Sequence, residues 1–191
     1  MEAPAILEVL SRRLPGDPGR FEAVSSLDGM PTIYIARDGF VDACAVLRDA
    51  LELQFAVLMD ITAVDYLPRE PRFEIIYLLV SPGVAGYGTT PKRLRVKVRV
   101  PGDDARVASV SGVWTAAGWA EREVFDLFGI QFDGHSDLRR ILMPDDWEGY
   151  PLRRDYPVQI KDPVKTYEPL QMSEEEFVAN VEAARSRTRR E

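Results

Sequence analysis

Apolar residues near the start of the chain fall first at helical spacing and then in two strand-like runs. Residues 4–14 carry them at the intervals of one helix face. Residues 21–27 and 32–36 are short runs on either side of Asp28 and Gly29, a pair typical of hairpin turns. The pattern predicts a helix followed by a β-hairpin.

The next apolar pattern predicts a second helix, from Asp38 as its N-cap to about Leu53. Cys44 falls among the apolar positions of this helix. We therefore expect it to pack as a small hydrophobic side chain rather than to react.

Three strand patterns follow, at residues 55–66, 73–80 and 93–100, with a long Gly/Pro-rich loop at 81–92. The second strand is apolar almost throughout and is expected at the centre of a sheet. The third alternates between apolar and basic residues, which predicts an antiparallel strand with one buried face. Because the chain is acidic overall, we expect the basic face to pair with carboxylates rather than with nucleic acid or lipid.

Helical patterns return at residues 103–110 and 115–128, and Gly129 suits the position just past a helix C-terminus. Strands grouped between helices predict an α+β fold, a mainly antiparallel sheet packed with helices. We place the boundary of this compact domain, residues 1–133, before an aperiodic segment.

Residues 134–191 are interpreted as an extended C-terminal docking arm that ends in a short helix. Prolines recur as far as residue 169, which excludes a long helix there. Ser173 and Glu176 have the spacing of a capping box at the start of the terminal helix. Because little of residues 158–191 is apolar, we expect this tail to be mobile in the free chain.

The composition narrows the function classes. A net charge of −7 over 191 residues disfavours general nucleic-acid binding. A single cysteine excludes an internal disulfide and a multi-cysteine zinc or iron–sulfur site held by this chain alone. The first residues do not resemble a signal peptide, and no apolar run is long enough for a bilayer, so we expect no direct membrane span.

Side chains able to do chemistry concentrate in residues 134–157. His135, the only histidine, lies near Asp133 and Asp137, but this spacing matches no recognised metal site, and a role in a turn explains it as well. Three carboxylates lie in an irregular loop that fixes no separation for acid–base catalysis: Asp145, Asp146 and Glu148.

The balance of residue types instead favours an interface. Between Glu121 and Pro157 there are nine acidic and five basic residues, and every basic one is arginine. Arginine suits planar, bidentate pairing, and Trp and Tyr are enriched with it at protein interfaces. We expect this segment to lie across another protein that satisfies its charges. The spacing of Arg122 and Asp126 also allows them to pair across one helix turn.

Three stretches resemble a known family: WAEREVFDLFG (119–129), GHSDLRRILMP (134–144) and DWEGYPLRRDYP (146–157). Together they are similar to the signature of the C subunit of the bacterial proton-pumping NADH:quinone oxidoreductase, whose mitochondrial counterpart is the 30-kilodalton subunit of respiratory complex I. Ser136 stands where the family usually has Pro, and Arg154 where it usually has Lys.

The resemblance implies a compact α+β domain with a C-terminal extension, in the peripheral arm of the complex on the cytoplasmic side of the bacterial membrane. It implies packing against the D subunit, which helps to form the quinone site and is called the quinone-site subunit from here on. The B and I subunits are implied to lie nearby. The resemblance also implies no cofactor and no catalytic residue in this chain, since FMN and the iron–sulfur clusters lie in partner subunits. The whole complex passes electrons from NADH to quinone and translocates protons.

The resemblance assigns docking and scaffold roles to the polar and aromatic residues of the matching motif. These are Glu121, Arg122, Glu123, Asp126, His135, Arg139, Arg140, Asp146, Trp147, Tyr150, Arg153, Arg154, Asp155 and Tyr156. Two alternatives remain. One is the equivalent subunit of a related membrane-bound hydrogenase or dehydrogenase, and the other is an independent hydrolase that uses the loop carboxylates with His135.

Overall fold

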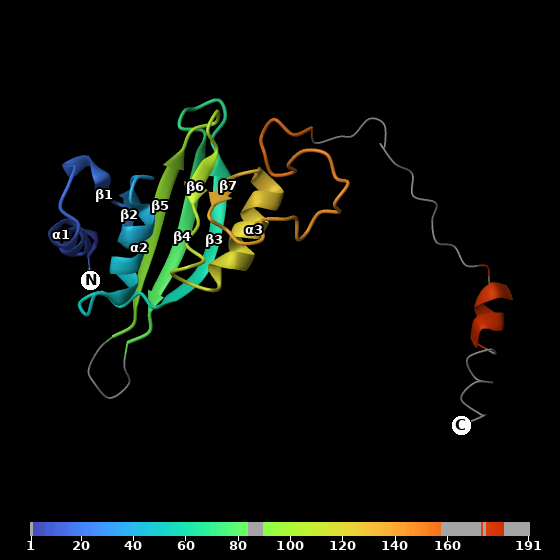
Figure 1. The fold of residues 1–191 in the computed structure, drawn as a ribbon, viewed down its shortest axis with the longest axis horizontal. Helices are drawn as coiled ribbons and strands as arrows, with labels where there is room; N and C mark the ends of the chain where they lie inside the picture. The colour runs from blue at the N-terminus through green and yellow to red at the C-terminus, as the bar shows by residue number, and fades with distance from the viewer. Residues whose placement is uncertain (1, 84–89, 158–172, 174, 182–191) are drawn as a thin grey trace, which may run out of the picture. The chain divides into compact units, whose positions relative to one another are not determined.

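Five strands form one mixed sheet in the order β1-β2-β5-β4-β3 (Figure 1). Three neighbouring pairs are antiparallel, and only β2 and β5 are parallel. The strands are β1 (Phe21–Val24), β2 (Thr32–Ile35), β3 (Val57–Asp65), β4 (Phe73–Ser81) and β5 (Lys92–Val100). The predicted hairpin, the internal position of β4 and the mainly antiparallel α+β fold are confirmed.

The structure is a computed structural model, and it describes residues 2–83, 90–157, 173 and 175–181. The chain divides into two units, Met1–Tyr156 and Pro157–Glu191. Within the second unit, residues 175–181 are helical and Ser173 with Glu176 forms the predicted capping box. The mobility that we predicted for the tail concerns mostly residues outside the described ones.

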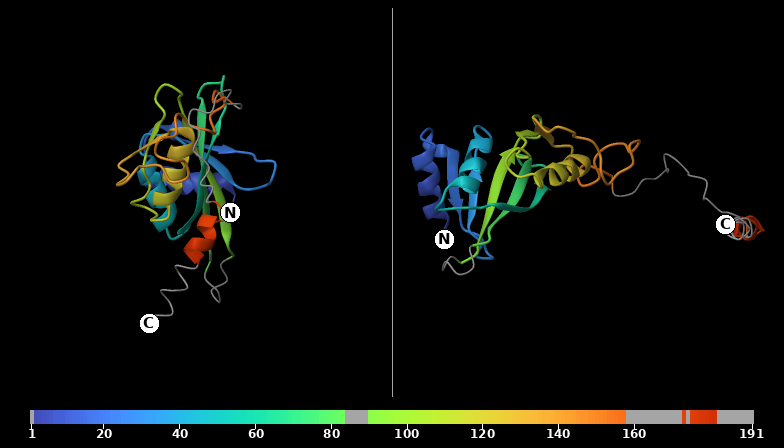
Figure 2. Two further views of the ribbon diagram at one scale, coloured as in Figure 1. Left: turned by 90° about the vertical axis from the view of Figure 1, so that its right-hand side faces the viewer. Right: turned by 60° about the horizontal axis from the view of Figure 1, so that its bottom comes forward.

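The described residues of the first unit include three α-helices: α1 (Ala3–Arg13), α2 (Phe40–Asp49) and α3 (Ala117–Phe128). Helix α1 packs beside β1 and α3 packs against β3, so these two helices lie at opposite ends of the sheet (Figures 1 and 2). No helix in the described part of the chain is long and apolar enough to cross a membrane.

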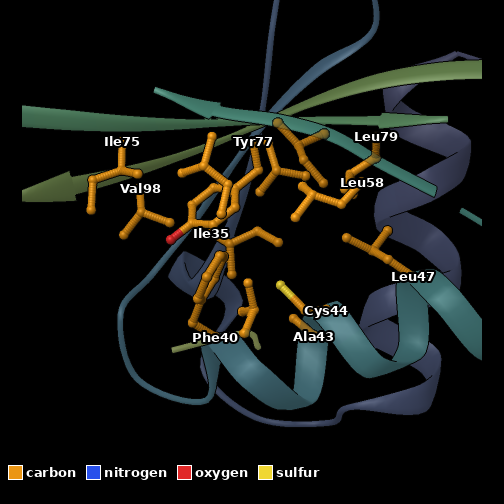
Figure 3. Packing of buried hydrophobic residues seen from close by; sticks show 14 of the residues in the cluster. Ile35, Phe40, Ala43, Cys44, Leu47, Leu58, Ile75, Tyr77, Leu79 and Val98 are labelled. Atoms are coloured by element: carbon orange, nitrogen blue, oxygen red, sulfur yellow. The ribbon is translucent and has the colours of Figure 1, made fainter. Parts of the chain in front are cut away.

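The core lies between α2 and one face of the sheet. Tyr77 and Leu79 of β4 point toward Phe40, Cys44 and Leu47 of α2, and all five side chains are almost fully buried (Figure 3). Burial raises the pKa of the Cys44 thiol well above its usual value, which disfavours the reactive thiolate. The packing role predicted for Cys44 is confirmed.

The alternation in β5 has the predicted outcome. Its four aliphatic side chains are fully buried, whereas the basic side chains that alternate with them, those of Arg93, Arg95, Lys97 and Arg99, lie on the opposite face. Three of the basic residues pair with carboxylates of neighbouring segments: Arg95 with Asp28 at 2.6 Å, Lys97 with Glu74 at 2.7 Å and Arg99 with Glu22 at 3.0 Å.

The helix predicted at 103–110 is wrong. Residues Arg106–Ala108 form a short strand, β6, which pairs in parallel with β7 (Gln131–Asp133). Val107 and Phe132 face each other in this register and are both buried. The partner strand lies beyond α3 in the sequence, so the local spacing of residues 103–110 carries no sign of the pairing.

The limits of α2 also differ from the prediction. Its N-cap is Gly39, with a φ of 66°, and no side chain caps it. Asp38 instead accepts a hydrogen bond from the side chain of Arg20 through its backbone carbonyl. The helix ends at Asp49 rather than Leu53, because the chain turns back there so that the N–H of Phe55 donates to the carbonyl of Leu47.

Candidate protein-docking site

Residues 134–156, called the arm from here on, lie along α3 (Figure 1). At one end His135 contacts Gly118 in the first turn of the helix, and at the other Arg153 contacts Phe128 at its last residue. The division into units falls after Tyr156, not after residue 133 where we placed it, because these contacts join the arm to the domain.

Asp126 holds the middle of the arm. One of its carboxylate oxygens accepts hydrogen bonds from three consecutive backbone N–H groups, those of Ile141, Leu142 and Met143, at 2.7–3.0 Å. Its other oxygen accepts a bond from Arg140 at 2.7 Å. Burial alone would raise the pKa of Asp126, but these hydrogen bonds outweigh it and the pKa is lowered. A fully buried, ionised carboxylate therefore fixes this turn of the arm.

Arg140 closes the loop that follows. Besides Asp126, its guanidinium donates to the backbone carbonyls of Trp147 and Gly149 at 3.0 and 3.1 Å. It also lies 5.5 Å from the centre of the Tyr150 ring. One side chain thus joins the two ends of the loop 141–149 to α3.

Arg122 binds the arm rather than its own helix. It donates to the backbone carbonyls of Arg139 and Arg140 at 3.0 and 2.9 Å, and its guanidinium lies 5.2 Å from the Trp119 ring. The pairing of Arg122 with Asp126 that the sequence allowed does not occur, since each has a partner in the arm.

Arg153 and Tyr150 cover the C-terminus of α3. Arg153 donates to the carbonyl of Phe128 at 2.6 Å, where a cation also suits the helix dipole, and lies 4.6 Å from the centre of the Tyr150 ring. The Tyr150 ring lies against Gly129, which follows the helix with a φ of 70°. A Cβ at Gly129 would come closer than 3.0 Å to three ring carbons.

Asp65, Arg72 and Asp155 connect the end of the arm to the sheet. Arg72 donates to both oxygens of Asp65, at 3.0 and 2.7 Å, and to Asp155 at 2.8 Å. The N–H of Arg154 also donates to Asp65. Burial would raise the pKa of Asp65, but the bonds from Arg72, Leu67 and Arg154 outweigh it and lower the pKa to about 2.

Glu121 and His135 hold the two short strands against the first half of α3. The carboxylate of Glu121 accepts from the N–H of Val110 and the hydroxyl of Ser109, just beyond β6. His135, just beyond β7, accepts the N–H of Asp137 at Nδ1, so its Nε2 carries the proton and donates to the carbonyl of Gly118. Burial raises the pKa of Glu121.

Trp147 and Tyr156 form the outer end of the arm, with stacked rings whose centres are 6.4 Å apart. The Trp147 indole N–H is buried and has no hydrogen-bond partner among the described residues. The side chains of Glu123, Arg139, Asp146 and Arg154 are exposed. Most residues that the motif singled out are therefore partners of one another, and only a few of them face outward.

Three exposed apolar residues near the arm were absent from our set of candidates: Trp119, Leu142 and Leu152. Trp119 had a signal in the sequence, since it flanks charged residues on α3. Leu142 and Leu152 had none, because the arm has no periodicity from which exposure can be inferred.

The contacts of His135 bear on the alternative in which this residue and the loop carboxylates catalyse hydrolysis. Both ring nitrogens of His135 are hydrogen-bonded, and its acidic neighbour is Glu121 at 4.0 Å, a residue outside the predicted hydrolase set. The described residues bring together no group of three or more His, Cys, Asp or Glu side chains able to hold a metal ion.

Comparison with known proteins identifies the class as a respiratory-chain subunit. The family model described as "Respiratory-chain NADH dehydrogenase, 30 Kd subunit" matches residues 33–162. These residues include most of β2, the whole of β3, β4 and β5, and the whole arm. The chain belongs to this family, and the resemblance of residues 119–157 is confirmed.

Two relatives are described as the C subunit of NADH-quinone oxidoreductase. That of Geobacter sulfurreducens is 48% identical over 140 residues, which cover 73% of this chain and 82% of the relative. That of Roseiflexus sp. (strain RS-1) is 41% identical over 159 residues, which cover 83% of this chain and 88% of the relative.

Two solved structures share the fold. A trypsin-resistant fragment of Nqo5 is 34% identical, with a TM-score of 0.58 over 72% of this chain and 100% of the fragment. A chain of the membrane-bound sulfane sulfur reductase, an archaeal respiratory membrane complex, has a TM-score of 0.65 over 88% of this chain and 98% of its own length. It is 24% identical, so this likeness concerns the fold alone.

Proposed function

We propose that this chain is a core subunit in the peripheral arm of a proton-pumping NADH:quinone oxidoreductase. The complex passes electrons from NADH through FMN and iron–sulfur clusters to quinone. Within it, the chain acts as a cofactor-free scaffold that seats the quinone-site subunit. The B and I subunits are further neighbours, on the cytoplasmic side of the bacterial membrane.

One observation carries this proposal: the polar residues of the family motif hold residues 134–156, the arm of this chain, in a fixed shape. Asp126, Arg140 and Arg153 each use their charge on backbone groups or on one another. Groups committed in this way are poorly available to a substrate, whereas a rigid arm is suited to binding a protein. The identity of 39–48% to proteins described as the C subunit of NADH-quinone oxidoreductase supports the same role.

The equivalent subunit of another membrane-bound respiratory complex is the second candidate, favoured by the shared fold with the sulfane sulfur reductase chain. The two candidates differ in the electron donor of the whole complex, which other subunits determine. Purifying the native complex through a tag on this chain and assaying it with NADH distinguishes them. NADH-dependent quinone reduction supports the first candidate, and a complex that contains the chain but does not oxidise NADH supports the second.

The scaffold role is tested by co-expression with the quinone-site subunit. We expect the two chains to co-purify in equal amounts, and the chain expressed alone to contain no stoichiometric iron or flavin. Bound flavin or an iron–sulfur cluster in the isolated chain would contradict the cofactor-free role. A failure of the wild-type chain to bind the quinone-site subunit in any co-expressed combination with the B and I subunits would contradict the docking role.

A further inference from the structure

Three large apolar side chains stay exposed where the arm meets α3. Trp119 on the helix is 66% exposed, and Leu142 and Leu152 on the arm are 60% and 51% exposed. Scattered exposed apolar residues are ordinary in a soluble protein, but neighbouring ones often mark an interaction surface. Trp119, Leu142 and Leu152 indicate such a surface only if they lie near one another in the fold.

The hydrogen bonds of the arm place Leu142 and Leu152 beside the helix that carries Trp119. Trp119 stacks on Arg122, which holds the carbonyl of Arg139. The N–H of Leu142 donates to Asp126, further along α3, and the N–H of Leu152 donates to the carbonyl of Leu127. From residue 119 to residue 127 a helix rises about 12 Å. The three residues therefore lie beside about two turns of α3, and they are called the seam patch from here on.

The seam patch is held rigid before any partner binds. Leu142 lies in the turn fixed by the buried Asp126 carboxylate, and Leu152 precedes Arg153, which is bonded to the C-terminus of α3. Side chains fixed on an ordered backbone lose little conformational entropy on binding, which favours affinity. A loose surface loop with the same residues has no such advantage.

The charges around the seam patch are mostly negative. Glu123 lies one helix turn from Trp119, and Asp145 and Glu148 lie in the loop that follows Leu142. All three side chains are exposed, and none of them forms an ion pair or hydrogen bond with another residue in the described ranges. Two exposed cations lie nearby: Arg154, two residues after Leu152, and Arg139, which pairs with Asp137.

From this geometry we infer that the seam patch is the contact that seats the protein partner of the proposed function, and that the partner presents apolar pockets bordered by Lys and Arg. This inference rests on the proposed function and assigns two different roles to residues of the family motif. Trp119, Leu142 and Leu152 supply the binding energy, whereas the charged motif residues maintain the shape of the arm. Unpaired carboxylates at the rim favour a basic partner surface and speed the encounter.

The test compares substitutions in the seam patch with matched ones elsewhere, and the purified quinone-site subunit is the probe. Trp119→Ala, Leu142→Ala and Leu152→Ala are each expected to weaken binding at least about tenfold, while the melting temperature stays that of the wild type. Leu27→Ala and Leu51→Ala are the controls, because both leucines are even more exposed but lie in turns outside the arm. The controls are expected to bind like the wild type.

The charge of the rim is tested separately. Glu148→Lys is expected to slow association with the quinone-site subunit, and added salt is expected to reduce the difference from the wild type. Glu8→Lys, an exposed position on α1 at the opposite end of the sheet, is the matched control and is expected to leave the association rate unchanged.

The possible results separate this inference from the proposed function. Wild-type binding together with unchanged binding by all three seam variants overturns the inference and leaves the scaffold role intact. Absence of wild-type binding, both to the purified quinone-site subunit and on co-expression with the B and I subunits, overturns both. A chain that dimerises by itself, and loses the dimer when Leu142 or Leu152 is substituted, also overturns the inference, because the patch then serves a second copy.

Discussion

Asp126 and Arg140 form an ion pair at 2.7 Å in which the carboxylate is fully buried and the guanidinium largely so. The pair links the helix to the arm and lies at the centre of seven hydrogen bonds between the two segments and the loop. The arm is therefore ordered chiefly by a charge on α3 rather than by apolar burial.

Asp126→Asn is expected to destabilise the fold by about 3 kcal/mol, because an amide has one acceptor oxygen where the carboxylate serves four donors, and Arg140 loses its counter-charge. Urea unfolding measures the loss, and hydrogen exchange should show faster exchange at residues 141–143. Asp137→Asn is the matched control. Its ion pair with Arg139 is exposed, so the change should stay within about 0.5 kcal/mol. Equal effects of the two substitutions would refute the central role of Asp126.

The sequence predicts those parts of this fold whose signal is local. The alternation of residues 93–100 assigns the side chains of β5 to its two faces, and the pair Asp28 and Gly29 indicates the hairpin. The path of the arm has no such signal. Asp126 looks like a residue on a solvated helix face until the N–H groups 15 to 17 positions later are placed against it.

The same limit applies to the charged residues of the motif. The composition of residues 121–157 indicated arginines suited to pairing with carboxylates in a partly buried setting, and Arg140 pairs in this way with Asp126. It did not indicate that the partners belong to the same chain, because that depends on whether the arm returns to α3. Apolar exposure at Leu142 and Leu152 is likewise a property of the folded arm.

Gly129→Ala is expected to cost at least about 2 kcal/mol. Roughly 1 kcal/mol comes from the positive φ, and the remainder from displacement of the Tyr150 ring by the new methyl group. The free energy of unfolding is again the readout. In a Tyr150→Ala background the same substitution should cost only the backbone part, about 1 kcal/mol, because the overlap is gone.

Gly16→Ala provides the control for this pair of measurements. Nothing lies within 4 Å of a Cβ at Gly16, and its φ is outside the left-handed region. The change should remain within about 0.5 kcal/mol. A cost at Gly129 that is the same with and without Tyr150 would mean that the ring does not pack there.

Asp65→Asn is expected to show a dependence on acid pH. The folded state lowers the pKa of Asp65 from 3.8 to about 2, so ionised Asp65 stabilises the fold above pH 3.8 and this contribution is lost as pH falls toward about 2. Near neutral pH the variant should be about 3 kcal/mol less stable, since Arg72 keeps only the half-exposed Asp155 as a carboxylate partner.

Urea unfolding of the wild type and Asp65→Asn at a series of pH values measures this difference. It should be largest above pH 3.8 and shrink steadily below it. Asp60→Asn, an exposed position in the same strand, should differ from the wild type by less than about 0.5 kcal/mol near neutral pH. A difference between the wild type and Asp65→Asn that is constant with pH would contradict the ion pair as its source.

Glu121→Gln is expected to show the opposite dependence. Burial raises the pKa of Glu121 above 4.5, and the bonds from Ser109 and Val110 only partly offset it. The folded state therefore holds this proton more tightly than the unfolded chain, and the contribution of protonated Glu121 is lost as pH rises through the folded pKa. An amide carries no charge and keeps an acceptor for the N–H of Val110. The stability of Glu121→Gln relative to the wild type should accordingly increase as pH rises from 4.5, and then level off.

Glu123→Gln, on the exposed face of the same helix, is the control and should show no comparable trend. A rise for both variants would point to a general charge effect, whereas a fall for Glu121→Gln would mean that ionised Glu121, next to His135, stabilises the junction of β7 with the arm.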